Sequence, residues 1–385
     1  MAHVFKKNRA RPSPLLGAAL LIAGIAIGAG ELGLPAAMAA AGYWPAILGT
    51  VLIFIGTLAS GMLTARLFLE SSARDLPSLF RQHLGRTGAA IFNVSYFTLA
   101  FCLLVAYWNG LLGLVGHGKW GIFTVAICGN VLFLGLRGDR RSFLGRCNGV
   151  LFLGVVLSFL LLTIAGCLHG GTPPPPVRSS WLRMPLGLPV LLCSFGYHQV
   201  IPIVCERLHR DRRRVYAALM GGTLLPLLFA IVIFTIAFRL FSQEELCHAA
   251  RTGLPLFSLL QDRATPEFVF LAGRCFSFLA IATSIISLSL ALHGAIGDIF
   301  TAKRRLFAAR ELLILASLPI ALLLPHLFLV VLGLCGGIFG NLIAGIIPIT
   351  PFLGKSYFRL RYLILWLFFA AIFAIELFQL LDRRP

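Results

Sequence analysis

Long apolar runs are the feature of this sequence that most constrains its fold. The chain has 385 residues, of which 58% are hydrophobic and 12% are charged, whereas a soluble domain has about 25% charged residues. About 20 apolar residues in a helix cross the hydrocarbon core of a bilayer, where backbone polar groups need internal partners. The sequence therefore predicts an all-α polytopic membrane protein with about eleven transmembrane helices. The runs cover residues 14–41, 43–69, 89–115, 120–136, 147–168, 185–207, 215–241, 268–300, 306–324, 327–349 and 362–381.

The positive charges lie in short clusters between these runs. A net charge of +19 would suggest nucleic-acid binding in a soluble chain, but no basic face interleaved with aromatic residues is present, so no nucleic-acid partner is expected. Loops rich in lysine and arginine stay in the cytoplasm, and most of the 33 such residues fall on the side of the N-terminus. The pattern predicts a plasma membrane protein, bacterial inner membrane in type, with a cytoplasmic N-terminus (residues 1–13) and an external C-terminus. Anionic lipid headgroups at the cytoplasmic face are expected to attract these basic clusters. The sequence shows no obligate protein partner.

Two connecting segments are predicted to lie outside the membrane on the external side. Residues 169–184 contain the tetraproline 173–176, which cannot be helical and forms a stiff linker. Residues 242–266 are polar and are expected to form a loop that contains a short helix. The nine cysteines are scattered through apolar runs without a C-x-x-C motif, so they are interpreted as small buried side chains and no metal site is expected.

The first apolar run is interrupted near its middle. The interruption reads Gly28-Ala29-Gly30-Glu31-Leu32-Gly33-Leu34-Pro35. Glycine costs about 1 kcal/mol and proline about 3 kcal/mol inside a helix, so the sequence predicts a break in this helix at membrane depth. Such a break is tolerated only where it lines a protein-enclosed cavity, in which its freed N–H and C=O groups can bind a ligand.

The sixth run contains a matching interruption. It reads Ser194-Phe195-Gly196-Tyr197-His198-Gln199-Val200-Ile201-Pro202. Corresponding breaks in two halves of a membrane protein, separated by an odd number of spans, indicate an inverted-repeat secondary transporter with its binding site at the midplane. The expected halves are residues 14–168 and residues 185–350, and residues 351–385 carry the eleventh span.

The chemistry of the two breaks suits a zwitterion. Half-helix N-termini present N–H groups to a carboxylate, and half-helix C-termini present carbonyls to an ammonium group or a metal cation. Aromatic side chains near the breaks could stack on an aromatic ligand. The alternative is that these rings only pack in the core or against lipid, since the chain contains 32 phenylalanines. The aromatic candidates are Phe195, Tyr197, Tyr107 and Trp108.

Two ionisable residues in the breaks are candidates for proton coupling. An ionisable group near mid-span costs about 2.5–3.5 kcal/mol on insertion scales and is by default a functional hypothesis. Glu31 is therefore interpreted either as the proton-coupling carboxylate or as a group that bonds freed N–H groups or reaches a water-filled vestibule. His198 is interpreted either as a proton carrier or as a buried histidine that satisfies the break.

A cation site is possible where the eighth run meets the first break. Thr283 and Ser284 could supply hydroxyl oxygens to a sodium ion, together with carbonyls of the first run. The alternative is that both hydroxyls bond back to their own helix, as is usual in membrane spans. Glu376, His293 and Asp298 are interpreted as packing or interface residues.

These motifs resemble those of the hydroxy/aromatic amino acid permeases, the tyrosine- and tryptophan-specific transport proteins. The resemblance covers nearly the whole chain. It is carried by Gly28-Ala29-Gly30-x-Leu32-x-x-Pro35 with residues 39–42, by Ser194-Phe195-Gly196-Tyr197-His198 with Ile201-Pro202, and by Ala282-Thr283-Ser284 to Leu290 with Gly297-Asp298-Ile299-Phe300. Two departures are Glu31, at a usually apolar position, and Leu292-His293-Gly294, where an aromatic residue and an acid are expected.

The resemblance implies the LeuT-type fold of the amino acid–polyamine–organocation superfamily, with five plus five inverted spans and one extra helix. It also implies import of an aromatic amino acid, tyrosine or tryptophan, by cation symport. Gly28, Ala29 and Gly30 would then offer backbone groups to the substrate carboxylate and amine, while Phe195, Gly196 and Tyr197 would line the side-chain pocket. No cofactor is implied apart from the coupling ion, for which the proton is the first expectation.

Three other functions are weaker interpretations. A membrane enzyme would need a nucleophile with an oriented base, or a metal cluster, and the candidate group is Cys193, His198, Cys205 and Glu206 on one broken helix. A channel would show filter loops or rings of charged residues, and the sequence shows neither. The remaining alternative is a symporter of another small neutral amino acid, driven by sodium and not by protons.

Overall fold

The computed structural model describes residues 14–116, 118–136, 140–169, 179–253, 256, 267–299, 315–324, 327–354 and 359–382. Throughout these ranges the regular structure is helical, as expected. Among the described residues, nine helices are long and apolar enough to cross a membrane, or ten when the bent first pair counts as one span. The ninth predicted span, residues 306–324, is described only from residue 315, where it forms a short helix. The tetraproline and the end of the loop 242–266 lie outside the described residues.

The elements follow the predicted runs closely. In chain order they are α1 (Pro14–Ala26), η1 (Ala29–Gly33), α2 (Leu34–Met38), α3 (Tyr43–Leu69), α4 (Leu76–Val115), α5 (Lys119–Leu136), α6 (Arg140–His169), η2 (Trp181–Gly187), α7 (Leu188–Ser194), η3 (His198–Val200), α8 (Ile201–Arg207), α9 (Arg212–Leu240), α10 (Gln243–Thr252), α11 (Glu267–Ile299), α13 (Ser317–Leu323), α14 (Phe328–Leu334), the π-helical segments η6 (Cys335–Gly340) and η7 (Leu342–Ile346), α15 (Ile347–Leu353) and α16 (Arg359–Asp382).

Three helices in the described ranges begin at side-chain caps, and one of them is α9, where the Asp211 side chain accepts from the backbone N–H groups of Arg213 and Arg214. The third span starts earlier than predicted, because Asp75 caps the backbone N–H of Ser78 and opens α4, which continues to Val115 through a kink at Gly85. Gly85 has a φ of 71°, a conformation that glycine adopts at little cost. Ser242 and Glu245 form a capping box that starts α10, so the short helix predicted in the loop 242–266 is confirmed.

One side of the molecule gathers basic residues from several connections. We call it the basic side. Arg207, at the end of α8, donates to the carbonyl of Gly17 near the start of α1 at 3.5 Å. The guanidinium of Arg66, near the end of α3, lies 5.9 Å from the ring centroid of Phe352 in α15. The start of α1 and the ends of α3, α8 and α15 therefore lie on one side of the molecule. This agrees with spans that cross the membrane in alternating directions.

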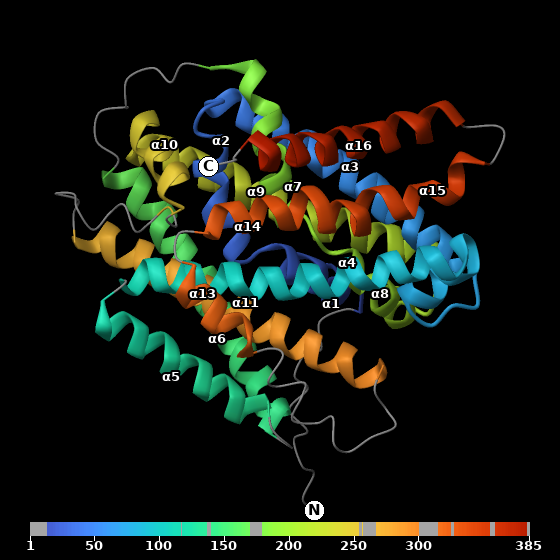
Figure 1. Ribbon diagram of the computed structural model, residues 1–385, viewed down its shortest axis with the longest axis horizontal. Helices are drawn as coiled ribbons and strands as arrows, with labels where there is room; N and C mark the ends of the chain where they lie inside the picture. The colour runs from blue at the N-terminus through green and yellow to red at the C-terminus, as the bar shows by residue number, and fades with distance from the viewer. Residues whose placement is uncertain are drawn as a thin grey trace, which may run out of the picture.

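The opposite side carries α10, and we call it the α10 side. Gln243 of α10 donates to the carbonyl of Ala39 at 2.9 Å, just beyond the end of α2. The backbone N–H of Ser180, which precedes η2, donates to the carbonyl of Ala41 at 2.7 Å, and Gln379 of α16 reaches the carbonyl of Leu186 at 3.0 Å. Figure 1 shows α10 and α8 near opposite ends of the long helices α3 and α4.

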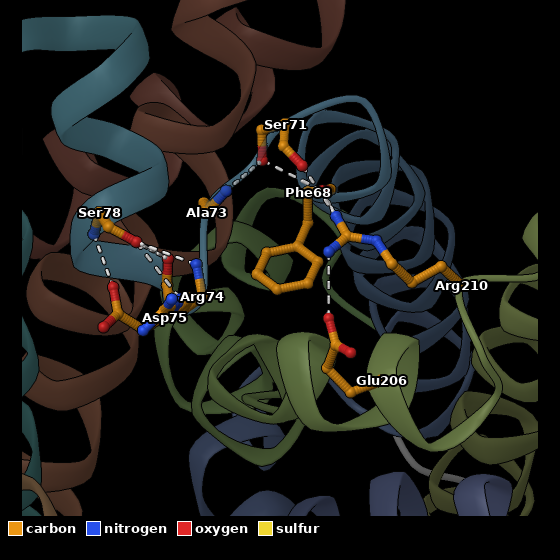
Figure 2. Close-up of polar contacts among 8 residues, drawn as sticks. All are labelled: Phe68, Ser71, Ala73, Arg74, Asp75, Ser78, Glu206 and Arg210. Carbon is orange, nitrogen blue, oxygen red and sulfur yellow. Dashed lines mark hydrogen bonds and ion pairs between the residues drawn. The ribbon is translucent and has the colours of Figure 1, made fainter.

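Arg210 ties two connections together on the basic side, as Figure 2 shows. Its guanidinium donates to the carbonyls of Phe68 at 2.6 Å and Ser71 at 2.8 Å, and it pairs with Glu206 at 3.1 Å. It also lies 5.1 Å from the ring centroid of Phe68. Arg210 thereby satisfies carbonyls at the end of α3 and joins them to the turn between α8 and α9.

The tenth span is widened by π-helical turns where it meets the sixth. At Gly336 in η6 an added Cβ would lie 1.9 Å from the carbonyl oxygen of Pro189 and 2.7 Å from the backbone nitrogen of Cys193. Both atoms belong to the backbone of α7, so they cannot rotate away. Only glycine allows α7 and η6 to approach this closely.

We expect Gly336→Ala to destabilise the protein by roughly 1–3 kcal/mol, because the added methyl group must push α7 away from η6. The control is Gly149→Ala in α6, where nothing lies within 4 Å of the added Cβ and where alanine is the better helix former. Thermal unfolding of the purified variants measures both effects. An unfolding midpoint for Gly336→Ala equal to that of the control would contradict the close approach.

Candidate functional site

The first predicted break is confirmed. Helix α1 ends at Ala26, Gly28 adopts an extended backbone conformation with φ −168° and ψ −155°, and the chain continues as the short η1 before α2. The two parts of this span are bent by 41° relative to each other. The glycines and the proline thus interrupt the helix where the sequence predicted.

The second predicted break is confirmed as well. Helix α7 ends at Ser194, Phe195 has φ −104° and ψ 23°, and a single turn, η3, leads from Tyr197 into α8. The side chain of Gln199 donates to the carbonyl of Gly196 at 3.2 Å. A side chain from the next turn therefore satisfies a carbonyl that the break leaves free.

The two breaks lie against each other. A Cβ added at Gly30 would lie 3.0 Å from the Oγ of Ser194, so the backbone of η1 passes directly beside the end of α7. The Oγ of Ser194 is buried and has no hydrogen-bond partner among the described residues. The sequence analysis quoted Ser194 in a motif but did not select it as a site residue, although its place directly before Phe195-Gly196-Tyr197 was the available signal.

The eighth span contributes one of its two predicted hydroxyls. The backbone N–H of Ala29 donates to the Oγ of Ser284 at 2.9 Å, although 255 positions separate the two residues. The hydroxyl of Thr283 instead donates to the carbonyls of Leu279 and Ala280 in its own helix, which is the alternative that the sequence analysis left open. Ser284 therefore lies at the first break, and the Thr283 hydroxyl bonds within α11.

Several polar atoms near the breaks are buried without partners. Both carboxylate oxygens of Glu31, both ring nitrogens of His198 and the Nε1 of Trp108 have no hydrogen bond within the described part of the chain. Glu31 is 0% exposed and His198 is 1% exposed. An isolated ionised carboxylate is very unfavourable in such surroundings, and a bound proton, ammonium group or metal cation would remove that penalty.

The two aromatic residues predicted at the second break are buried, and one of them has its hydroxyl group bonded to another helix. Phe195 and Tyr197 are both 0% exposed. The hydroxyl of Tyr197 donates to the carbonyl of Thr57 in α3 at 3.0 Å, and the ring of Tyr197 stacks on that of His198 with centroids 4.7 Å apart. The hydroxyl of Tyr197 is thus occupied by α3, and its ring packs on His198.

Tyr107 and Trp108 lie on α4 and are also buried, Tyr107 at 9% and Trp108 at 1% exposure. Helix α4 also contacts the tenth span, where the Sγ of Cys335 in η6 donates to the carbonyl of Leu99 at 3.9 Å, and η6 in turn packs closely on α7. The third span therefore contributes to the same region as the sixth and tenth spans.

The group considered for an enzyme does not converge. Cys205 is buried, whereas Glu206 is exposed on the basic side and pairs with Arg210. In the described ranges no group of three His, Cys, Asp or Glu side chains could hold a metal ion. The side chains of His293 and Asp298 fall outside the described residues.

Comparisons with known proteins agree on one family. The model of the tryptophan/tyrosine permease family matches residues 11–356. A tryptophan-specific transport protein of Haemophilus influenzae is 25% identical over 360 residues, covering 87% of this chain and 86% of the relative. Tyrosine-specific transport system 2 of the same organism is 27% identical and covers 83% of each chain. Glutamine transporter 2 of Aliivibrio fischeri is 24% identical and covers 74% of this chain and 76% of the relative.

The fold has a counterpart among solved structures. The crystal structure of MhsT in complex with L-phenylalanine aligns with a TM-score of 0.54 at 15% identity, covering 95% of this chain and 96% of that chain. This likeness shows the fold, so the predicted LeuT-type architecture is confirmed.

Ser194 and Tyr197 should respond differently to loss of their hydroxyls. Tyr197→Phe removes a buried hydrogen bond and should lower stability by about 0.5–1.5 kcal/mol, whereas Ser194→Ala removes an oxygen without a partner and should cost nothing or stabilise slightly. Thermal unfolding of both variants measures the difference. A greater loss for Ser194→Ala than for Tyr197→Phe would show that the Ser194 hydroxyl has a structural partner after all.

Proposed function

The chain belongs to the tryptophan/tyrosine permease family, and from this premise we propose that it imports tyrosine or tryptophan by proton symport, with alternating access to a site between the two helix breaks. It is a permease and not an enzyme. The single observation that carries the proposal is the contact between the two breaks, where buried polar groups of Glu31, Ser194 and His198 have no hydrogen-bond partner among the residues that the structure describes.

An amino acid fits this arrangement by its charges. The substrate carboxylate would accept from the backbone N–H groups of Gly28 and Gly30, on either side of Ala29, whose own N–H donates to Ser284, and the dipole of a half-helix favours negative charge there. The ammonium group would bind free carbonyls of the breaks and the Oγ of Ser194, and an aromatic side chain would stack on Phe195, with Trp108 and Tyr107 from α4 nearby. Relatives named for tryptophan and tyrosine transport support the aromatic substrate.

The proton is the proposed coupling ion, and Glu31 is its proposed carrier. A proton on Glu31 removes the penalty of an isolated buried carboxylate, so loading is favoured while the centre is closed. Release would follow when the site opens to water. His198 is the second candidate, since its ring nitrogens are equally without partners.

The topology completes the proposal. The basic side is proposed to face the cytoplasm, because arginine-rich connections stay on that side of the membrane. The α10 side, with the end of α16, is then external, and anionic lipid would contact the basic clusters. We place the protein in the bacterial inner membrane, as its bacterial relatives suggest.

A second candidate is sodium-driven transport of another neutral amino acid. Two observations favour it: Ser284 lies at the first break, where its hydroxyl could join backbone carbonyls around a sodium ion, and one relative is named as a glutamine transporter. The two candidates differ in the gradient that drives uptake and in the competitor that blocks it.

Uptake by proteoliposomes tests both candidates. Labelled tyrosine, tryptophan and glutamine are offered separately, with either a proton gradient or a sodium gradient imposed. We expect tyrosine or tryptophan to accumulate with the proton gradient alone. Accumulation only with sodium would favour the second candidate, and uptake of none of the three by folded protein would refute the first.

Glu31→Gln separates coupling from binding. The amide cannot load and release a proton, so accumulation driven by a pH gradient should fall by more than tenfold, while exchange of internal for external substrate stays within about threefold of the wild type. Glu267→Gln, at the exposed start of α11, is the control and should change neither rate. If Glu31→Gln accumulated substrate normally, Glu31 would not be the proton carrier.

A further inference from the structure

A groove lies between the end of α4 and the first turns of α11, and we call it the α4–α11 groove. Its volume is about 330 Å³. Cys275 and Phe278 of α11 are exposed, so the groove opens on the outer surface of the helix bundle. The lining is apolar apart from one guanidinium and one thiol, and it consists of Leu114, Val115, Arg274, Cys275, Phe278 and Leu279.

Arg274 brings a positive charge to this apolar groove. Its side chain donates to the carbonyl of Leu114 at 3.4 Å, and its guanidinium lies 5.3 Å from the ring centroid of Phe270. Within the described ranges Arg274 forms no ion pair with a carboxylate. A guanidinium carries several N–H donors in one planar fork, so donors of Arg274 remain available to a ligand.

The end of α4 places this charge at one border of the membrane. Helix α4 follows Asp75, which lies near Arg210 on the basic side (Figure 2), so its other end, with Leu114, lies on the α10 side. Trp120, just beyond that end, is exposed, and tryptophan is enriched at membrane–water interfaces. The guanidinium of Arg274 therefore lies at the level of lipid headgroups, and Phe278, one turn further along α11, lies at the level of acyl chains.

The surface around the groove favours a lipid over a water-soluble ligand. Phe268 and Leu271 of α11 are exposed, so the outer face of this helix contacts acyl chains on both sides of Arg274. A free anion would contact only the guanidinium, whereas a lipid would also cover the apolar wall. The phosphodiester of a lipid is an anion that a guanidinium can bind through two parallel hydrogen bonds.

We propose that the α4–α11 groove binds one anionic phospholipid from the leaflet on the α10 side. The phosphodiester accepts from the guanidinium of Arg274, and a segment of one acyl chain lies along Phe278 and Leu279. Lys119, exposed at the start of α5, adds a second positive charge beyond the end of α4, which favours an anionic headgroup over a zwitterionic one.

This site is separate from the anionic lipid expected at the basic clusters, because it lies at the opposite end of α4. The proposal requires only that the α10 side is one face of the membrane. The assignment of that face to the exterior rests on the proposed topology, whereas the binding of lipid does not.

A lipid in the groove joins the third span to the eighth. Helix α11 also carries Ser284, whose hydroxyl accepts from Ala29 at the first break, and α4 carries Tyr107 and Trp108. The lipid therefore stabilises the packing of two unbroken spans that enclose the breaks, at the end where Arg274 meets Leu114.

Cys275 provides a reporter for this site, because its thiol is free, exposed and part of the lining. Purified full-length protein in dodecyl maltoside is titrated with dioleoylphosphatidylglycerol, and labelling of the Cys275 peptide by N-ethylmaleimide is followed by mass spectrometry. We expect this anionic lipid to slow labelling about fivefold or more, because a charge-assisted bond to Arg274 holds it in the groove. Dioleoylphosphatidylcholine, with the same chains, and glycerol phosphate, without chains, should each slow labelling less than about twofold.

Variants of two arginines test the headgroup contact. Arg274→Gln should remove the difference between the two lipids, and Arg274→Lys, which keeps the charge without the planar fork, should keep part of it. The matched control is Arg239→Gln, in the last turn of α9, since Arg239 is exposed and does not line the groove. Cys247 of α10 also lies outside the lining, so its labelling should not respond to either lipid.

Each other outcome would overturn the proposal. Equal slowing by the two lipids in the wild type would show that the groove accepts any acyl chain, and slowing by glycerol phosphate as strong as that by the anionic lipid would indicate a site for a free anion. An equal effect of the anionic lipid in the wild type and in Arg274→Gln would remove the proposed headgroup contact.

The test remains decisive if Arg274→Gln does not fold, because the comparison of the two lipids on the wild type then decides it. No amino acid substrate is used, so failure of the lipid site leaves the proposed function intact. Failure of the proposed function appears instead in the uptake by proteoliposomes.

Discussion

The structure depends on one constraint, which is that backbone polar groups inside a bilayer must find partners within the protein. An unbroken helix pairs these groups within its own segment, and most described spans of this chain are of that kind. The first and sixth spans are not, so the other spans must enclose them. Their breaks survive because Ser284 accepts from Ala29, Gln199 donates to Gly196 and neighbouring side chains exclude lipid. The remaining free groups are what a ligand can bind.

Close packing around the breaks depends on small residues at defined places. Gly30 lets η1 pass beside Ser194, and Gly336 lets η6 pass beside the backbone of α7. Gly61 in α3 likewise leaves room for Tyr197, whose ring would meet any added Cβ there. The first contact joins the two broken spans to each other, and the other two join the sixth span to the tenth and to α3, so movement of a half-helix must carry its neighbour or separate from it at a glycine.

Local sequence predicted the breaks because glycine and proline act on the backbone of their own segment. The positions 28–35 and 194–202 therefore matched the structure, as did the capped helix in the loop 242–266. Contacts between distant segments could not be predicted from local sequence. The bond between Ala29 and Ser284 spans 255 positions, and nothing in the sequence near Tyr197 indicates that its hydroxyl reaches Thr57. Glu376 was interpreted as a packing or interface residue, and the two glycines that contact its side chain, Gly333 and Gly337, belong to the tenth span.

The hydrogen bonds on the two sides of the molecule bear on how the centre can open. On the basic side Arg210 joins the α8–α9 turn to the end of α3, and Arg207 joins the end of α8 to the start of α1. On the α10 side, Gln243 joins α10 to the chain just beyond α2. Exposed ion pairs contribute little, typically 0–1 kcal/mol, whereas the bonds to carbonyls at helix ends satisfy groups that otherwise need water. In the proposed alternating access, opening towards either side would supply that water, so each set of bonds would be exchanged for hydration while the other set stays formed.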